Sequence, residues 1–288
     1  MQYRTAVLED KAALFALWQE AFGDTEETVS SFMKTCFRED YTVVAETEKN
    51  IVAAIYLLEA ELPSQQNFLY VYAAATKKAY RQKGIMTALL DFAKAFAEKQ
   101  KKDGLYLVPA DENLFAYYAK RGYQNAFLKD RYTIKRQDFI PFSTVESNLA
   151  FQEMTTAKAY ADMRKEALKG YPSIQYPIDI LQLDIHFAKH FQSPIYQIEH
   201  GFFHVDLEED TLEFLEFAIP NLKEQQEIIT SAYQQFPKMQ TIICHLPHNM
   251  PFFMDMQPEI IPAGMILPLQ DIALTEKMQS AYLGITLG

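Results

Sequence analysis

A short basic loop around Arg81, Lys83 and Gly84 separates a strand-like run from a helical pattern. Residues 67–76 are rich in aromatic and β-branched side chains, and residues 87–102 place apolar side chains at helical spacing. The first N–H groups of a helix have no intrahelical partner, and the helix dipole adds positive potential there. Glycine lets a ligand approach the backbone, and the two cations add charge. The pattern therefore predicts an anion site that suits a pyrophosphate; the alternative is a basic turn that caps a surface helix.

Three successive segments of the sequence resemble the GNAT superfamily of acyl-CoA-dependent N-acyltransferases. The family's acyl-CoA signature is Arg or Gln, two residues of any type, Gly, one of any type, then Gly or Ala. Residues 81–86 match its first and fourth positions and depart from it at Met86. The resemblance continues through the strand-like residues 104–109 and the helix-like residues 113–123, which carry the family's Asn, Tyr and Gly in the expected order.

The resemblance implies acetyl-CoA as cosubstrate and indicates which residues bind it. The end of the family's central strand, whose backbone pairs with pantetheine, corresponds to Ala74, Ala75 and Thr76. Asn113 resembles the family's CoA-contacting Asn, and a helix-capping role is equally compatible with its position. The loop and the first helical turn would bind the pyrophosphate. These residues are Arg81, Gln82, Lys83, Gly84, Ile85, Met86 and Thr87.

The resemblance also assigns the acid of the reaction. Tyr118 corresponds to the family's catalytic Tyr and is expected to protonate the leaving thiolate; the alternative is a packed aromatic residue. The strand position that holds a Glu in histone-type members is Tyr70 here, so no base is evident. Proton removal would pass through water, Glu59, Glu61 or the terminal carboxylate of Gly288. The last expectation follows from similarity to enhanced-intracellular-survival acetyltransferases, in which the C-terminus enters the active site.

The elements around this loop predict an α/β (α+β) fold. Two amphipathic helices come first, followed by an antiparallel meander that leads into the loop. This order is that of the GNAT fold, a mixed, mostly antiparallel twisted sheet flanked by helices. The expected strands are residues 41–46, 51–62, 67–76, 104–108 and 127–136, the last of which should close the first sheet.

The second half of the chain repeats this order of elements. A junction rich in Pro and polar residues predicts a GNAT acyl-CoA-binding catalytic domain at residues 1–140 and a second GNAT-like α/β domain at residues 150–288. A strand at residues 265–269 should close the second sheet. Only residues 220–221 stand where the first half has its basic loop, so we expect a degenerate domain that covers the acceptor site or stiffens the first domain.

Composition limits the partners. The chain has 288 residues, 49% of them hydrophobic, which is ample for two packed domains. A formal net charge of −11 argues against a nucleic-acid partner and mildly favours cationic ones. No apolar run reaches the roughly 18 residues of a membrane helix, and the N-terminus lacks a secretion signal. We therefore expect a cytoplasmic protein without a membrane partner.

Metal chemistry has little support in the sequence. Cys36 and Cys244 are the only cysteines, and both lie beside apolar residues. His186 and His190 have the spacing of a zinc-protease motif, but Phe187 stands where that motif has its catalytic Glu. We therefore expect no metal.

Taken together, these residues predict an N-acetyltransferase that transfers an acetyl group from acetyl-CoA to a primary amine of a small molecule or a peptide. The alternative is a non-catalytic acyl-CoA-binding or interaction protein. That alternative is motivated by Met86, by the missing strand Glu and by the degenerate second half.

Overall fold

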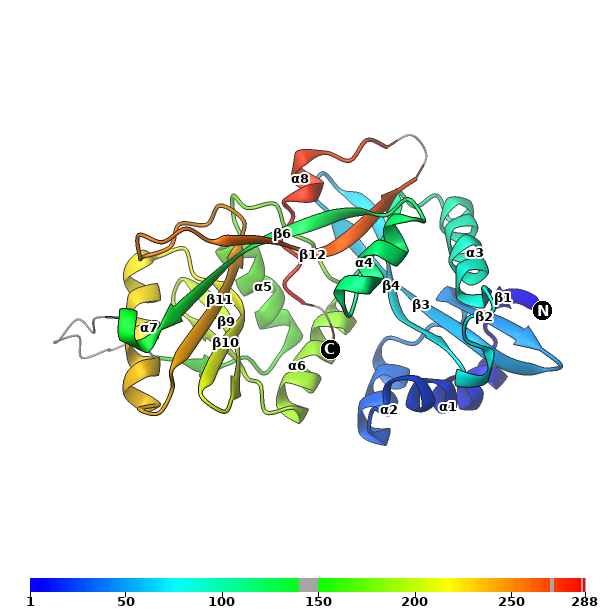
Figure 1. Cartoon of the computed structure of the whole chain (residues 1–288), viewed down its shortest axis with the longest axis horizontal. Coiled ribbons are helices and arrows are strands. Elements are labelled where there is room, and N and C mark those ends of the chain that lie inside the picture. Colours follow the sequence, from blue (N-terminus) through cyan, green and yellow to red (C-terminus); the bar gives the residue numbers. More distant parts are fainter. Residues whose placement is uncertain (140–149, 270–271, 286, 288) are drawn as a thin grey trace. The chain divides into compact units, whose positions relative to one another are not determined.

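The computed structural model describes residues 1–139, 150–269, 272–285 and 287 (Figure 1). Its internal contacts divide the chain into two compact units. Unit 1 consists of Met1–Asn125, Gln175–Leu183 and Gly264–Thr275. Unit 2 consists of Ala126–Ile174, Asp184–Ala263 and Glu276–Gly288.

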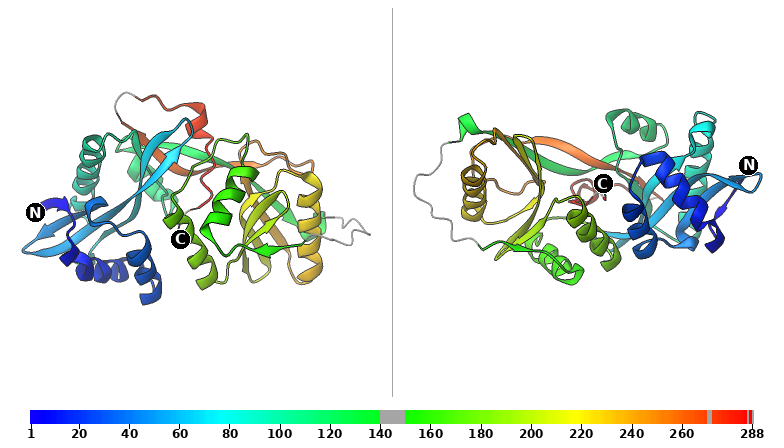
Figure 2. Two further views of the ribbon diagram at one scale, coloured as in Figure 1. Left: turned by 180° about the vertical axis from the view of Figure 1, so that it is seen from behind. Right: turned by 90° about the horizontal axis from the view of Figure 1, so that it is seen from below.

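Unit 1 is built on a mixed sheet with the strand order β1-β2-β3-β4-β5-β12. Strands β4 and β5 are parallel, and the other neighbours are antiparallel. Helices α1 and α2 cover one face, and α3 and α4 cover the other (Figures 1 and 2). The strands are β1 Gln2–Thr5, β2 Thr42–Thr47, β3 Asn50–Leu62, β4 Gln66–Thr76, β5 Gly104–Leu107 and β12 Glu259–Pro268. The helices are α1 Lys11–Phe22, α2 Glu26–Thr35, α3 Ile85–Lys99 and α4 Glu112–Ala119, with short 3-10 turns at Leu8–Asp10, Glu39–Tyr41 and Lys78–Tyr80.

Local capping signals account for the helix starts in unit 1. The side chain of Thr25 caps α2 by accepting a hydrogen bond from the N–H of Thr28 at 3.2 Å. Helix α4 is capped by Asp111, whose Oδ1 accepts from the N–H groups of Asn113 and Leu114 at 2.8 and 3.1 Å. The helix-capping alternative for Asn113 is therefore wrong, since Asn113 lies inside the first turn with an exposed side chain.

The two faces of the first sheet are filled differently. The face under α3 and α4 holds aliphatic residues of the strands and of α3, such as Leu69 and Leu89. The face under α1 and α2 is aromatic: the ring centroid of Trp18 lies 4.7 Å from that of Phe32 and 5.6 Å from that of Tyr72. Burying such rings stabilises the fold strongly, because each removes a large apolar area from water.

Two strands pair in a different sheet from the one expected. Strand β6 (Gln124–Lys135) pairs antiparallel with β11 (Thr241–Pro247), and Ala126–Lys135 belong to unit 2. Strand β12 pairs antiparallel with β5 in unit 1. The expectations that residues 127–136 close the first sheet and residues 265–269 the second are therefore wrong. Side-chain pattern and apolar content predict that a segment is a strand, but they do not identify the strand beside it.

Unit 2 has the strand order β7-β8-β9-β10-β11-β6. Strands β10 and β11 are parallel, and α7 connects them, as α3 connects β4 and β5. Helix α7 packs on one face of this sheet and α5 on the other. The remaining strands are β7 Gln152–Glu153, β8 Ile195–Ile198, β9 Gly201–Glu208 and β10 Thr211–Ala218. The helices are α5 Ala157–Ala167, α7 Leu222–Gln235 and α8 Glu276–Gln279, with a 3-10 turn at Arg136–Asp138. Helix α6 (Ile178–His190) belongs to unit 1 up to Leu183 and to unit 2 from Asp184.

The expected fold class is confirmed. Each unit is a mixed, mostly antiparallel sheet flanked by helices, and each has one parallel pair joined by a helix. Among the residues that the structure describes, no helix combines the length and the apolar character needed to cross a bilayer.

Candidate functional site

Strand β4 contains a β-bulge near its C-terminal end. Ala73 has a φ of +46°, and Ala73 and Ala74 together face the single residue Ile55 of β3. Bulges kink a strand, and they are frequent beside active sites because they re-aim the backbone. The sequence shows only a run of small residues here, which does not reveal the bulge.

Strand β4 also separates from β5 before this bulge. The pairing of β4 with β5 runs from Phe68 opposite Gly104 to Tyr70 opposite Tyr106, whereas β4 continues to Thr76. Within the described ranges, the side of β4 that faces β5 therefore has no strand partner after Tyr70. The buried Oγ1 of Thr76 likewise has no hydrogen-bond partner there. This stretch, which includes Ala74 and Ala75, can bind an extended ligand by strand-like hydrogen bonds.

The N-terminus of α3 is open. Gly84 is the residue before the first helical turn, with a φ of +75°, and no side chain caps the helix. A Cβ placed on Gly84 would meet no atom within 4 Å, so a ligand can approach its backbone. Gln82 also has a positive φ of +61°. Ile85 is buried, so the uncapped N–H groups begin on a well-anchored turn. Uncapped amides and the helix dipole make this turn an anion site.

Two exposed cations flank this turn. The Nε of Arg81 donates to the carbonyl of Thr76 at 3.0 Å, which ties the loop to the end of β4. The Nζ of Lys83 donates to the carbonyl of Ala79 at 2.9 Å and lies 5.1 Å from the ring centroid of Tyr80. Both charges therefore stay beside the open helix end.

Met86 and Thr87 turn their side chains into the protein. Met86, which departs from the family signature, is half-buried and packs on the aliphatic core of unit 1. The Oγ1 of Thr87 accepts a hydrogen bond from Nη2 of Arg121 at 2.5 Å and lies 3.3 Å from the hydroxyl of Tyr117. Arg121 also stacks on the ring of Tyr117 at 3.4 Å, so it joins the start of α3 to α4. Sequence reasoning missed Arg121, because its partners are distant in sequence.

Tyr118 lies at the end of α4 in a tyrosine cluster. Its ring centroid is 5.1 Å from that of Tyr117 and 5.7 Å from that of Tyr123. Burial raises the pKa of Tyr118 to about 12. Burial also raises the pKa of Tyr70, and the nearby Tyr118 raises it further. In the part of the chain that the structure describes, the Tyr118 hydroxyl makes no hydrogen bond. It is therefore a protonated donor at neutral pH, near the point where β4 leaves β5.

The proposed bases differ in their surroundings. Glu59 accepts hydrogen bonds from Lys102 at 2.5 Å and from Arg38 at 2.9 Å. Burial would raise the pKa of Glu59, but these two cations outweigh it and lower the pKa, which makes the carboxylate a weaker base. Glu61 is exposed. Gly288 lies outside the described residues, so its role stays a prediction.

Sequence reasoning missed a carboxylate on the aromatic face of unit 1. Asp24, between α1 and α2, accepts a hydrogen bond from Nε1 of Trp18 at 2.6 Å. Burial raises the pKa of Tyr72 on β4, and the charge of Asp24 adds to that shift. The proximity of Asp24 to β4 depends on how the helices pack on the sheet, so the sequence alone does not reveal it.

Unit 2 has no open helix end at the corresponding place. The side chain of Asn221 caps α7 by accepting from the N–H groups of Lys223 at 2.9 Å and Glu224 at 3.3 Å. Strand β10 does carry a bulge, since its register with β9 shifts between Phe214 and Glu216. The second unit therefore repeats the bulge but not the exposed amides.

The C-terminal segment packs within unit 2. The N–H of Tyr282 donates to the carbonyl of Pro172 at 2.7 Å, and Ile174 donates back to Tyr282 at 3.1 Å. Leu287 is also buried. Among the described residues 272–285 and 287, this segment forms an isolated bridge to Ser173 and no longer strand pairing.

Comparison with known proteins identifies the first unit. Residues 2–126 match the family model described as an acetyltransferase (GNAT) domain. The fold is similar to a GCN5-related N-acetyltransferase from Kribbella flavida, with a TM-score of 0.67 and 13% identity over 93% of this chain and 71% of that chain. It is also similar to a conserved Enterococcus faecalis V583 protein described as a probable N-acyltransferase. The TM-score is 0.71 and the identity 17%, over 93% of this chain and 72% of that chain.

The fold is also similar to a tandem GNAT protein from the clavulanic acid biosynthesis pathway. Its TM-score is 0.51 at 11% identity, over 94% of this chain and 100% of that chain. No curated protein matches the sequence. At such identities the solved structures show the fold alone, whereas the family model shows the family of the residues it matches. Residues 2–126 are a GNAT acetyltransferase domain, and this match together with the shared fold supports an acyltransferase.

Proposed function

We propose that this acyltransferase transfers an acetyl group from acetyl-CoA to a primary amine of a small molecule or peptide. The observation that carries the proposal is the open N-terminus of α3 at Gly84, which follows a strand whose backbone is unpaired on one side. Acetyl-CoA supplies the thioester, and its pyrophosphate and pantetheine need an anion site and an extended hydrogen-bonding edge, respectively.

The residues of unit 1 fit that ligand. The backbone of Ala74, Ala75 and Thr76 offers the edge, and the buried Oγ1 of Thr76 lacks a partner among the described residues. The amides of residues 82–87 would bind the pyrophosphate, with Arg81 and Lys83 adding charge. Asn113 is exposed in the first turn of α4 and would add a polar contact.

Tyr118 is the proposed acid. A phenol with a raised pKa keeps its proton, and its hydroxyl is unengaged among the described residues, so it can donate to the leaving thiolate. The acceptor amine must lose a proton, and water, Glu59, Glu61 and Gly288 stay open as its route. Asp24 is a further carboxylate of unit 1, and it is proposed to bind a cationic acceptor on the aromatic face.

The second half is proposed to be a degenerate GNAT-like domain. We place the acyl-CoA-binding domain at residues 1–140 and the second domain at residues 150–288. The side-chain cap of Asn221 supports the degenerate character of the second domain, because it occupies the amides that a pyrophosphate would need. We also propose a cytoplasmic location, in keeping with the acidic composition.

Calorimetry followed by a turnover assay tests the proposal. Acetyl-CoA should bind the full chain, and 3′-dephospho-CoA should bind comparably, because the pyrophosphate is the anchored group. Release of free thiol should then be measured with polyamines, aminoglycosides and peptides as acceptors. Binding of acetyl-CoA without thiol release from any primary amine would contradict the proposal, and so would release that is equally fast with alcohols.

A further inference from the structure

Unit 2 contains a cavity of about 350 Å³ that the proposed acetyl transfer does not use. Apolar walls are contributed by Phe187 of α6, Leu215 of β10 and Leu287. Polar side chains reach it from α6 and β9, namely Asp184 and His204. A cavity with apolar walls and a few convergent polar groups is the usual form of a small-molecule site.

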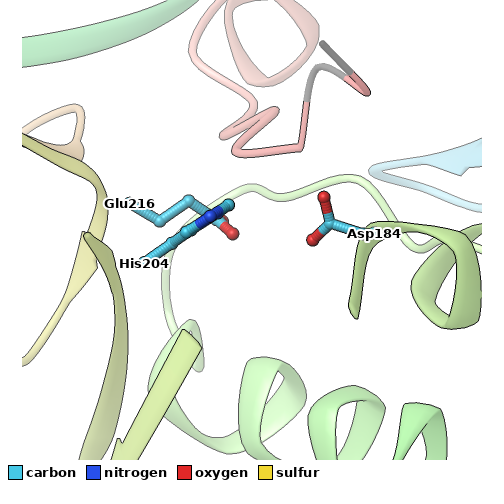
Figure 3. A group of neighbouring side chains, drawn as sticks. All are labelled: Asp184, His204 and Glu216. Carbon is cyan, nitrogen blue, oxygen red and sulfur yellow. The ribbon is translucent and has the colours of Figure 1, made fainter. Parts of the chain in front are cut away.

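Asp184 is an incompletely bonded carboxylate in this cavity. Only 5% of the residue is exposed, and its Oδ2 is buried without a hydrogen-bond partner in the described part of the chain. Burial, with the charge of Glu216, raises the pKa of Asp184 to about 6, against the opposing effects of His204, Arg164 and the Tyr160 hydroxyl. Figure 3 shows its carboxylate directed towards His204 and Glu216. A buried carboxylate oxygen without a donor is costly, so a ligand that supplies one would be favoured.

A metal ion is one candidate ligand. Asp184, His204 and Glu216 each offer a ligand atom, and these atoms lie within 4.8 Å of one another. However, Glu216 already pairs with Arg164 through Oε1 and accepts from the hydroxyl of Tyr160 at 2.5 Å through Oε2. A cation bound to Glu216 would have to displace one of these partners, so the complete metal site is disfavoured.

The hydrogen bond of His204 to Ser193 fixes which ring nitrogen can accept. The hydroxyl of Ser193 donates to the carbonyl of Val205 at 2.8 Å, so it must accept from Nε2 of His204 at 3.0 Å. When His204 is uncharged, its lone pair is therefore on Nδ1, which has no hydrogen-bond partner among the residues described. Asp184 and His204 thus provide acceptors, and the missing component is a donor.

We propose that this cavity binds a small molecule through a primary ammonium group at Asp184, with an apolar body against Phe187, Leu215 and Leu287. Among the described residues, the cavity wall also carries Lys129 and Asp206, whose charges are opposite. Burial, the largest effect, and Arg131 lower the pKa of Lys129, against the opposing charges of Glu213 and Glu216. An ammonium group offers three donors, which suits a carboxylate stripped of water.

Binding of n-hexylamine to the full chain at pH 7.5 tests this, with 1-hexanol as the matched neutral probe. Hexylamine should bind saturably in calorimetry and raise Tm, and hexanol should do neither. Asp184→Asn, which keeps the side-chain shape, should weaken hexylamine binding about tenfold or more, as expected for a lost charge-assisted hydrogen bond. Asp206→Asn, at the same cavity, should change it less than about threefold, because that half-buried carboxylate stays in partial contact with water.

A further variant tests the site without altering Asp184, in case Asp184→Asn does not fold. Ala188→Leu adds bulk to the cavity wall without changing charge and should also weaken hexylamine binding. Acetyl-CoA affinity, measured in parallel, should be unchanged in all three variants, which separates this site from the proposed acetyl transfer. Equal affinity of Asp184→Asn and the unaltered chain for hexylamine would overturn the proposal. So would tight binding of zinc chloride that depends on Asp184 while hexylamine does not bind.

Discussion

The guanidinium of Arg164 and the carboxylate of Glu216 form an ion pair that is almost fully withdrawn from solvent, with 6% and 1% of their side-chain surfaces exposed. The Nη2 of Arg164 also donates to the carbonyl of Leu283 at 3.3 Å, so the pair holds the C-terminal segment. Gly284 passes this pair closely: a Cβ on it would lie 1.9 Å from Oε1 of Glu216. This contact requires glycine at position 284.

Gly284→Ala should therefore destabilise the protein by roughly 2–4 kcal/mol, through the strained positive φ and the clash with Glu216. Gly170→Ala is a matched control, because Gly170 has a φ of +92° and no atom within 4 Å of the added Cβ. It should cost only about 1 kcal/mol. Urea unfolding measures both, and equal losses would contradict the role of Glu216.

Gly84→Asp should weaken binding of acetyl-CoA at least about tenfold, because a carboxylate would then stand at the open end of α3. Gly23→Asp is the control: φ is +77° at Gly23 and +75° at Gly84, and neither added Cβ meets an atom within 4 Å. The two variants should lose similar stability, while only Gly84→Asp loses affinity in calorimetry. Adding Arg81→Ala should weaken binding further. Unchanged affinity in the Arg81→Ala, Gly84→Asp double variant would refute the pyrophosphate site.

Tyr118→Phe should lower kcat by about 10²-fold or more and leave acetyl-CoA affinity nearly unchanged, as expected for a general acid. Tyr123→Phe removes a neighbouring buried hydroxyl that has no partner among the described residues, and its kcat should stay close to that of the unaltered enzyme. Since the pKa of Tyr118 is raised to about 12, its ionisation should cause no loss of rate between pH 7 and about pH 10. Steady-state rates over that range measure this, and a fall in rate below about pH 10 that is absent in Tyr118→Phe would contradict the raised pKa.

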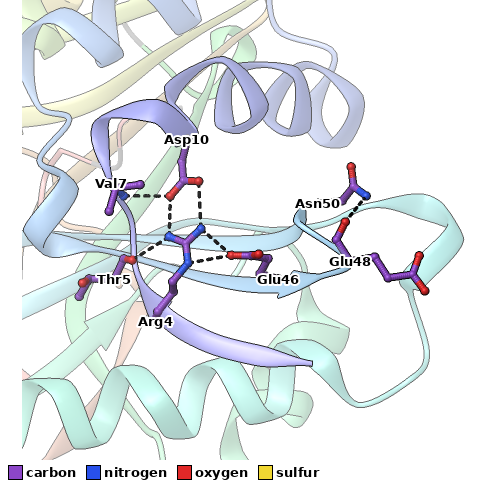
Figure 4. A network of polar contacts seen from close by, with 7 residues as sticks. All are labelled: Arg4, Thr5, Val7, Asp10, Glu46, Glu48 and Asn50. Carbon is purple, nitrogen blue, oxygen red and sulfur yellow. Dashed lines mark hydrogen bonds and ion pairs between the residues drawn. The ribbon is translucent and has the colours of Figure 1, made fainter.

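The short strand β1 is fixed by Arg4, which bonds Asp10 at 2.6 Å and Glu46 at 2.7 Å (Figure 4). The hydrogen bond from Arg4 lowers the pKa of Asp10. Because the folded-state pKa lies below the unfolded value of 3.8, this stabilisation is present above that pH and lost as pH falls through the folded-state pKa.

Asp10→Asn should accordingly cost roughly 1–3 kcal/mol at pH 7. The difference in unfolding free energy from the unaltered protein should shrink below about pH 4. Glu48→Gln, at the exposed turn between β2 and β3, serves as control and should show a small difference at every pH. Unfolding curves from pH 7 to pH 2.5 measure this, and a constant difference for Asp10→Asn would contradict the shifted pKa.

Local signals made part of the fold predictable. The cap at Thr25 and the glycine at Gly84 depend on a few neighbouring residues, and the structure places both at helix starts. Strand β1 escaped prediction because four residues carry too little periodicity. The bulge at Ala73 escaped it because many small-residue runs form regular strands.

The rest depended on contacts between distant segments. Alternation within residues 127–136 and the apolar run at residues 265–269 predicted two strands correctly but could not identify their neighbours. The contacts of Asp24 and Arg121 form only when the helices pack on the sheet, so the sequence does not predict them. The same holds for Asp184, whose unpartnered oxygen exists only after α6, β9 and β10 meet.

The pairing of β12 with β5 has a consequence for synthesis on the ribosome. Unit 1 contains the candidate acyl-CoA site, yet its sheet includes Gly264–Pro268, which are translated long after β5. Until they emerge, β5 has an open edge, and exposed edges promote association with other chains. A nascent or truncated chain that stops after residue 140 would therefore be aggregation-prone rather than a small working enzyme.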